Sequence, residues 1–80
     1  MHELGILRHA MKTVSDIAEK NNIQKIKHLT LQVGTQSDVV PIFLEKLFPV
    51  AADSFPLMQG AQLRIERVPG AGLQIKEIGY

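Results

Sequence analysis

The spacing of apolar residues alternates between a helical and a strand period along this chain, and that alternation decides which folds are open to it. Between residues 4 and 18 the apolar positions lie three or four residues apart, which draws one stripe along a helix. The stripe stops before Asn21-Asn22, a pair that tolerates the left-handed backbone with which helices end. The pattern therefore predicts a first helix that ends near Lys20.

The spacing of apolar residues also predicts the next two elements. Over residues 25–34 the period falls to two, which predicts a strand with one buried face formed by Leu29, Leu31 and Val33. Helical spacing then returns between Val40 and Ala51 and predicts a second amphipathic helix.

Three features set the expected limits of the second helix. Ser37 or Asp38 is expected to cap it, and Pro41 suits its first turn, where a missing N–H costs nothing. Pro49 would remove a hydrogen bond from the helix interior, so a kink or break is expected there.

Two further strands are predicted near the C-terminal end, over residues 61–66 and 73–76, with a reversal at Pro69-Gly70-Ala71-Gly72 between them. Ile78 falls out of phase, which indicates a bulge. We expect these strands to form an antiparallel hairpin. The prediction is an α+β fold of order αβαββ, in which residues 1–80 form a single domain and two helices pack on one face of a three-stranded sheet.

Composition excludes several classes of function. The chain has 80 residues, a net charge of +1 and no cysteine, so a disulfide framework, a thiol nucleophile and a zinc ribbon are excluded. Without a strong positive field or aromatic stacking platform, RNA binding ranks last among the hypotheses. No membrane span, signal peptide or catalytic motif is visible, so we expect a cytoplasmic protein that is not an enzyme. A core this small makes a homodimer plausible.

The amino terminus carries the candidate site. The Met1 amine, the His2 amide nitrogen and the His2 imidazole can close fused chelate rings around one cation, and Glu3 can add a fourth donor from its backbone or carboxylate. A planar set of N and O donors favours Ni(II) or Cu(II) over zinc, magnesium or calcium. Binding requires a neutral amine, so affinity should fall on mild acidification. The alternative is that Met1-His2-Glu3 is an ordinary chain end that binds no metal. His9 and His28 are expected to be ordinary solvated side chains in either case.

The whole chain resembles the HypA family of hydrogenase-maturation metallochaperones. The segments MHELGILRHAM, LQVGTQSDV and QGAQLRIERVP come in that family's order and spacing, and GLQIKEI is similar to the strand after its zinc domain. The resemblance implies Ni(II) as transient cargo, bound by the amino terminus and His2 with Glu3 beside it. It also implies delivery to the large subunit of a nickel–iron hydrogenase, or to urease in some bacteria, together with a HypB-like GTPase.

One departure from that family is large. Family members carry a zinc ribbon with two C-x-x-C pairs between the second and third strands, whereas residues 69–72 stand in its place here. No structural zinc is therefore expected. A natural lineage that lost the ribbon and an engineered deletion closed by a glycine linker both fit the sequence. The loss also motivates an alternative function, a metal-independent interaction module in metalloenzyme assembly.

Overall fold

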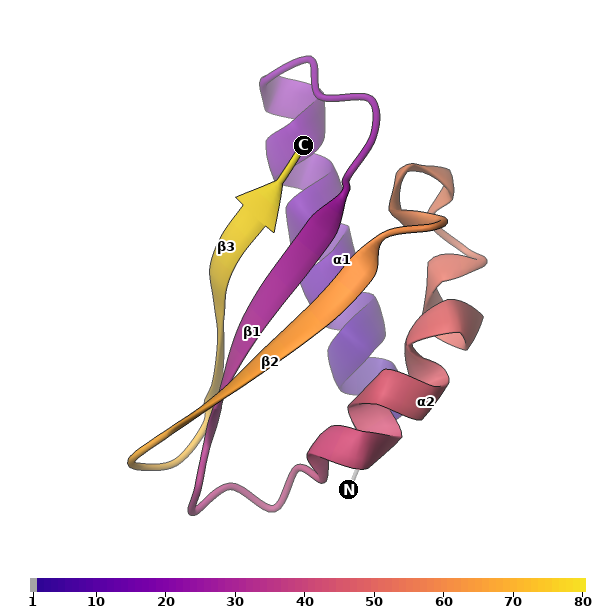
Figure 1. Ribbon diagram of the computed structural model, residues 1–80. Coiled ribbons are helices and arrows are strands. Elements are labelled where there is room, and N and C mark those ends of the chain that lie inside the picture. Colours follow the sequence, from indigo (N-terminus) through magenta and orange to yellow (C-terminus); the bar gives the residue numbers. More distant parts are fainter. Residues whose placement is uncertain (1) are drawn as a thin grey trace.

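The computed structural model describes residues 2–80 and confirms the α+β fold and the element order αβαββ (Figure 1). A short 3₁₀ helix is added between the second helix and the second strand. In the described residues no helix is long and apolar enough to cross a membrane. The elements are α1 (Glu3–Lys20), β1 (His28–Gly34), α2 (Pro41–Ala52), the 3₁₀ helix η1 (Pro56–Met58), β2 (Gln62–Val68) and β3 (Leu73–Gly79).

The end of α1 confirms the sequence prediction. Asn22 has a positive φ of 56°, and the Ile23 N–H donates to the Ala18 carbonyl at 2.8 Å. This bond satisfies one of the carbonyls that a helix end leaves without an intrahelical donor. The chain then turns toward β1.

The start of α2 differs from the prediction. The helix begins at Pro41 with Val40 as its N-cap residue, and no side chain caps it in the usual way. The Ser37 hydroxyl accepts instead from the Val39 N–H at 3.1 Å, within the preceding loop. Capping by Ser37 or Asp38 was therefore a wrong expectation, because the helix starts two to three residues later than these side chains require.

Pro49 does not break α2, which continues to Ala52. Proline inside a helix removes a hydrogen bond at a cost of roughly 3 kcal/mol. Pro49 itself is exposed, whereas Phe48 and Ala51 beside it are buried in the core. Packing of the inner face thus holds the helix together across the missing bond.

The sheet has the strand order β2-β1-β3, which corrects the predicted hairpin. The strands β2 and β3 do run antiparallel to each other, as expected, but β1 lies between them and bonds to both (Figure 1). β1 pairs parallel with β2 and antiparallel with β3. On the open face, Lys76 of β3 reaches across β1 to Glu66 of β2 at 2.8 Å. The prediction considered only neighbouring segments. The central position belongs to the strand whose apolar side chains, Leu29, Leu31 and Val33, are completely buried.

The connection between β2 and β3 passes close to the backbone of Gly34, which lets β3 pair with the edge of β1 opposite β2. Strands separated by one other strand lie about 9–10 Å apart, and a four-residue connection spans about 13 Å at most, so residues 69–72 must pass close over the end of β1. The Gly34 N–H donates to the Gly72 carbonyl at 2.8 Å, and the Gln36 N–H donates to the Gly70 carbonyl at 2.9 Å. A Cβ at Gly34 would meet the backbone of Gly70 and Ala71.

A bulge in β3 confirms the irregularity expected near Ile78. Ile75 pairs with Leu31 and Glu77 pairs with Thr30, which leaves Lys76 as the additional residue. Ile78 thereby returns to the inner face, opposite Leu29.

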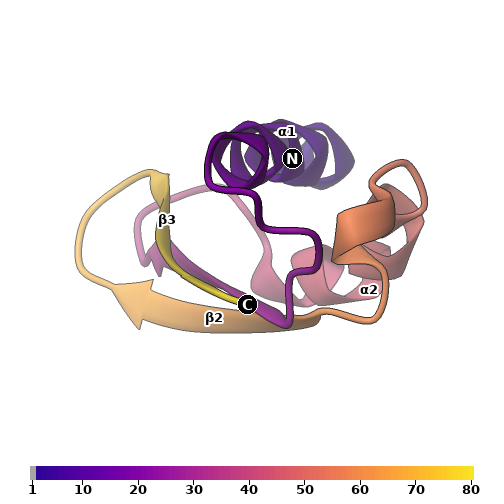
Figure 2. The same ribbon diagram turned by 90° about the horizontal axis from the view of Figure 1, so that it is seen from above.

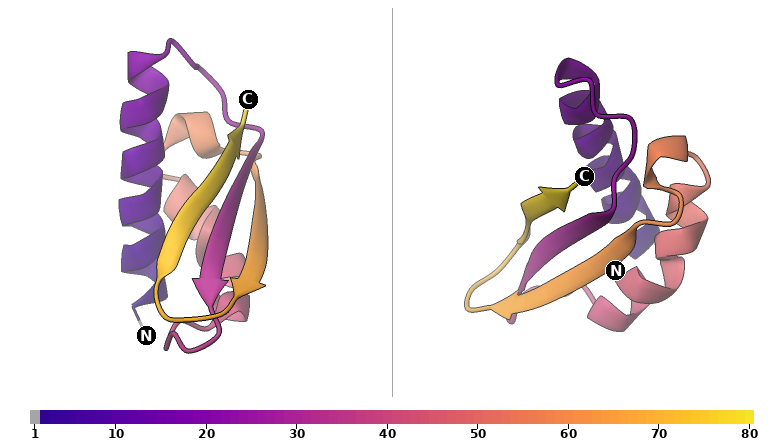
Figure 3. Two further views of the ribbon diagram at one scale, coloured as in Figure 1. Left: turned by 90° about the vertical axis from the view of Figure 1, so that its left-hand side faces the viewer. Right: turned by 45° about the horizontal axis from the view of Figure 1, so that its top comes forward.

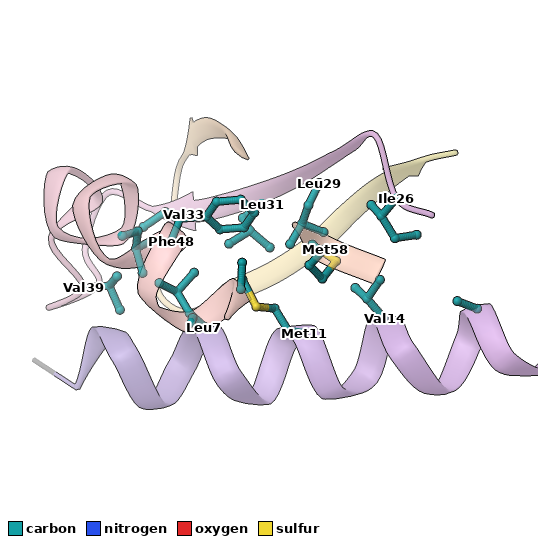
Figure 4. Packing of buried hydrophobic residues seen from close by; sticks show 14 residues of the cluster. Leu7, Met11, Val14, Ile26, Leu29, Leu31, Val33, Val39, Phe48 and Met58 are labelled. Carbon is teal, nitrogen blue, oxygen red and sulfur yellow. The ribbon is translucent and has the colours of Figure 1, made fainter. Parts of the chain in front are cut away.

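The core lies between the helices and one face of the sheet. In Figure 2, α1 lies above the sheet, and α2 lies next to α1 on the β2 side. Figure 3 shows that both helices are on the same face of the sheet. In Figure 4, Leu7, Met11 and Val14 of α1 point toward the strands. Burying one such side chain stabilises the fold by about 1.5–3 kcal/mol. The largest fully buried side chains are Leu7, Met11, Val14, Ile26, Leu29, Leu31, Val33, Leu44 and Met58.

Gly34→Ala should destabilise the protein by about 1–3 kcal/mol, because the added Cβ forces the backbone at Gly70 away from β1. Gly5→Ala is the matched control: no atom lies near its Cβ position, and alanine favours a helix by up to about 1 kcal/mol. Urea denaturation measures both. Equal effects of the two substitutions would show that the loop does not need this close approach.

Candidate metal-binding site

His2 lies at the start of α1 with its side chain outside the helix. It is the N-cap residue, with φ −101° and ψ 56°, and its carbonyl accepts from the Ile6 N–H at 2.9 Å. The side chain is exposed and makes no capping bond. Met1, the other predicted nitrogen ligand, lies outside the described residues. The His2 imidazole is thus placed where a small ion can reach it.

Glu3 has a structural role that the sequence did not reveal. Only 5% of the residue is exposed, and its Oε2 accepts from the Val40 N–H at 3.0 Å. That donor is the main cause that holds the pKa of the Glu3 carboxyl below its ordinary value of 4.5. The two residues lie 37 positions apart in the sequence, so no local pattern could have indicated the contact. It joins the first turn of α1 to the start of α2.

An open groove of about 890 Å³ runs beside His2, between α1, the loop before α2 and the start of β3. Its apolar lining includes Ile6, Leu73 and Ile75. His2, His9 and Asp38 bring polar groups to it. The side chain of His9 is exposed, as expected from the sequence, and it shares the groove with His2.

In the described part of the chain, no group of side chains is arranged to bind a metal ion by itself. Within residues 2–80, no three His, Asp or Glu side chains come together in a way that could hold an ion. His2 and His9 are separated by two helical turns, about 10 Å along the axis, which is too far to share one ion.

His28 is not the solvated side chain expected from the sequence. Its side chain is only 22% exposed, it lies against Gly79 on the neighbouring strand, and its Nε2 is 3.5 Å from a Glu77 carboxylate oxygen. Its place on the sheet, opposite a residue without a side chain, explains the burial.

The outer face of α2 carries apolar side chains that the core does not use. Ile42, Phe43 and Val50 of α2 are each between 48% and 53% exposed, and Val40, just before the helix, is 38% exposed. Single exposed apolar residues are ordinary, but several on one short helix indicate a surface that another molecule can cover.

Comparison with known proteins gives consistent matches. Residues 1–73 match the family model described as "Hydrogenase/urease nickel incorporation, metallochaperone, hypA". The hydrogenase maturation factor HypA of Deinococcus radiodurans is 40% identical over 72 residues, which are 90% of this chain and 59% of that protein. The corresponding factor of Trichodesmium erythraeum is 38% identical over 72 residues, 90% of this chain and 60% of its own.

The chain thus spans about 60% of the length of these curated relatives. A solved structure supports the fold alone: the solution structure of the Ni metallochaperone HypA from Helicobacter pylori aligns with a TM-score of 0.89 at 13% identity, over 99% of this chain and 97% of that one.

Glu3→Gln should make stability less sensitive to acid. Because the folded-state pKa of Glu3 is lowered, its carboxylate stabilises the fold fully above about pH 4.5, and that contribution is lost as the pH falls through the lowered pKa. Thermal unfolding between pH 7 and pH 3 should therefore show a smaller fall in Tm for Glu3→Gln than for the parent. Glu45→Gln, on the exposed side of α2, is the control and should follow the parent. Parallel profiles for parent and Glu3→Gln would contradict this assignment.

Proposed function

Because the chain belongs to the HypA family of hydrogenase and urease nickel-incorporation metallochaperones, we propose that it binds Ni(II) at its amino terminus as cargo and passes the ion on for assembly of a nickel–iron hydrogenase. The observation that carries this proposal is the position of His2. Its imidazole lies outside α1, exposed and beside an open groove. The family's described role is that of a metallochaperone, in agreement with the expectation of a protein that is not an enzyme.

The proposed donor set is the Met1 amine, the His2 amide nitrogen, the His2 imidazole and one donor from Glu3. Main-chain donors supply what the side chains of the described residues lack. Nitrogen and oxygen donors in a plane suit Ni(II) or Cu(II), whereas zinc prefers a tetrahedral set. The absence of cysteine removes thiolate ligands and the zinc ribbon together.

The proposed partners follow from the family. We expect the hydrogenase large subunit to receive the ion and a HypB-like GTPase to assist, in the cytoplasm. The groove beside His2 offers a recipient protein an approach to the bound ion from the open side of α1.

Calorimetric titration of Ni(II) into the untagged protein at neutral pH should show one site of micromolar or tighter affinity. His2→Ala and acetylation of the amino terminus should each abolish that binding, because each removes a donor of the fused chelate rings. His9→Ala is the matched control, an exposed histidine of the same groove, and should bind as the parent does. Binding that survives His2→Ala, or no binding by the parent, would contradict the proposal.

The exposed face of α2 supports a second candidate function, a metal-independent module that docks on a maturation partner. Ile42, Phe43 and Val50 present apolar surface away from the core. In this function the protein keeps the docking surface and does not carry nickel.

The second function predicts that a purified HypB-like GTPase binds the protein without nickel, unaffected by His2→Ala. Phe43→Ser should weaken that complex about tenfold or more, as loss of a central apolar anchor does. Glu45→Ser on the same helix should have little effect. Binding measured by biolayer interferometry with and without Ni(II) separates the two functions, since a complex that forms only with nickel and requires His2 would exclude the metal-independent one.

A further inference from the structure

β3 forms one edge of the sheet, and its outer side has no partner strand in the described part of the chain. Such an edge presents unpaired N–H and C=O groups to other chains. The additional residue Lys76 interrupts it, because Ile75 pairs with Leu31 and Glu77 pairs with the adjacent Thr30. A bulge normally prevents edge pairing, since a regular strand cannot match it. A strand that carries the same bulge and runs in the opposite direction can match it.

The hydrogen bonds to β1 indicate which residues of β3 direct their backbone groups outward. The Gly34 N–H donates to the Gly72 carbonyl at 2.8 Å. Successive residues of an antiparallel strand turn their N–H and C=O groups alternately toward and away from the same neighbour. Leu73 and Ile75 therefore direct theirs away from β1. The additional residue in the bulge delays the alternation by one position, so Ile78 is the next residue that faces outward.

A second copy of β3 that runs antiparallel has the same spacing in reverse. When Ile75 of each copy lies opposite Ile78 of the other, outward-facing backbone groups meet on both sides of the bulge and can form hydrogen bonds. The two residues between them then form opposite-charge pairs, Lys76 of each copy opposite Glu77 of the other. A shift of one residue in either direction would instead place two lysines or two glutamates opposite each other, which is destabilising. The charges thus favour one register.

In this register, side chains of the same kind meet on each face of the sheet. Lys76 and Glu77 lie on the open face, where Lys76 contacts Glu66 at 2.8 Å and the Glu77 side chain is 60% exposed. Ile75 and Ile78 belong to the inner face and are only partly buried. Pairing of two copies would bury them further and continue both faces across the joint.

α1 adds an apolar surface on the same side of the molecule. Ile6, Ala10 and Thr13 line the groove between α1 and the start of β3. Ile17 continues this stripe by one helical turn and is 40% exposed. In Figure 2, α2 lies on the β2 side of the sheet, so it does not cover the edge of β3. The α1 helix of a second copy can therefore pack against this stripe once the two β3 strands are paired.

We propose that two copies of this chain associate through their β3 strands, with Lys76 of each copy opposite Glu77 of the other. The dimer has twofold symmetry and a continuous six-stranded sheet, of order β2-β1-β3-β3-β1-β2. This inference goes beyond nickel binding and does not depend on it, because none of the proposed nickel donors belongs to the contact.

Two charge-reversed variants test the register. Glu77→Lys places lysines opposite each other, and Lys76→Glu places glutamates opposite each other, so each variant alone should dimerise about tenfold more weakly than the parent. Mixing the two variants restores opposite charges at both positions, and the mixed dimer should form as readily as the parent's. Sedimentation velocity from micromolar to millimolar concentration measures each sample. Glu45→Lys, a charge reversal at an exposed position of α2, is the control and should dimerise as the parent does.

Amide hydrogen exchange of the parent tests the edge without any variant. The N–H groups of Leu73, Ile75 and Ile78 should exchange quickly in dilute protein and more slowly as the concentration rises. The Gln74 N–H, which the alternation directs toward β1, should exchange slowly at every concentration. This comparison keeps the inference testable even if a charge-reversed variant does not fold.

Three results would overturn the dimer. They are a parent that stays monomeric at millimolar concentration, a Glu77→Lys variant that dimerises as readily as the parent, and protection that appears on the outer face of α2 instead of β3. Nickel titration of the same protein gives its result separately. Failure of the dimer would leave the proposed function in place, and a parent that binds no nickel would leave the dimer in place.

Discussion

β1 is hydrogen-bonded along both edges, and the rest of the structure is arranged around it. Its side chains Leu29, Leu31 and Val33 have no exposed surface and lie beneath the inner face of α1. The parallel pairing with β2 requires a crossover, which α2 supplies, and the antiparallel pairing with β3 requires the short connection over Gly34. The position of the amino terminus then follows, because α1 packs on the sheet with His2 at one end of the groove.

Local patterns predicted the elements well because each element is half buried. The change of period between residues 18 and 29 marked both the end of α1 and the buried face of β1. The strand order could not be predicted for a physical reason. Which strands pair depends on how much apolar surface each possible arrangement of the sheet buries, and the residue pattern of a single segment does not show this. The pairing of β2 and β3 as neighbours therefore looked natural from the short loop alone, although the glycine that allows the crossing is Gly34, in a different segment.

The candidate site was predictable in part. His2 could be named from its place as the second residue of the sequence, and in the structure it is the N-cap residue of α1. The burial of Glu3 could not be predicted, because its partner is a backbone N–H 37 residues away. Nor could the groove, since α1, β3 and the loop before α2 form it together. A single side chain thus connects the proposed nickel ligands to the helix whose outer face carries exposed apolar residues.

We propose that nickel is held by main-chain nitrogen and one imidazole at the end of α1. X-ray absorption spectroscopy of the protein loaded with one equivalent of Ni(II) tests it most directly. We expect a planar site of four nitrogen or oxygen donors that includes one imidazole and no sulfur, with the imidazole signal lost in His2→Ala. A site with two imidazoles, or six-coordinate nickel whose spectrum is the same in His2→Ala, would contradict it.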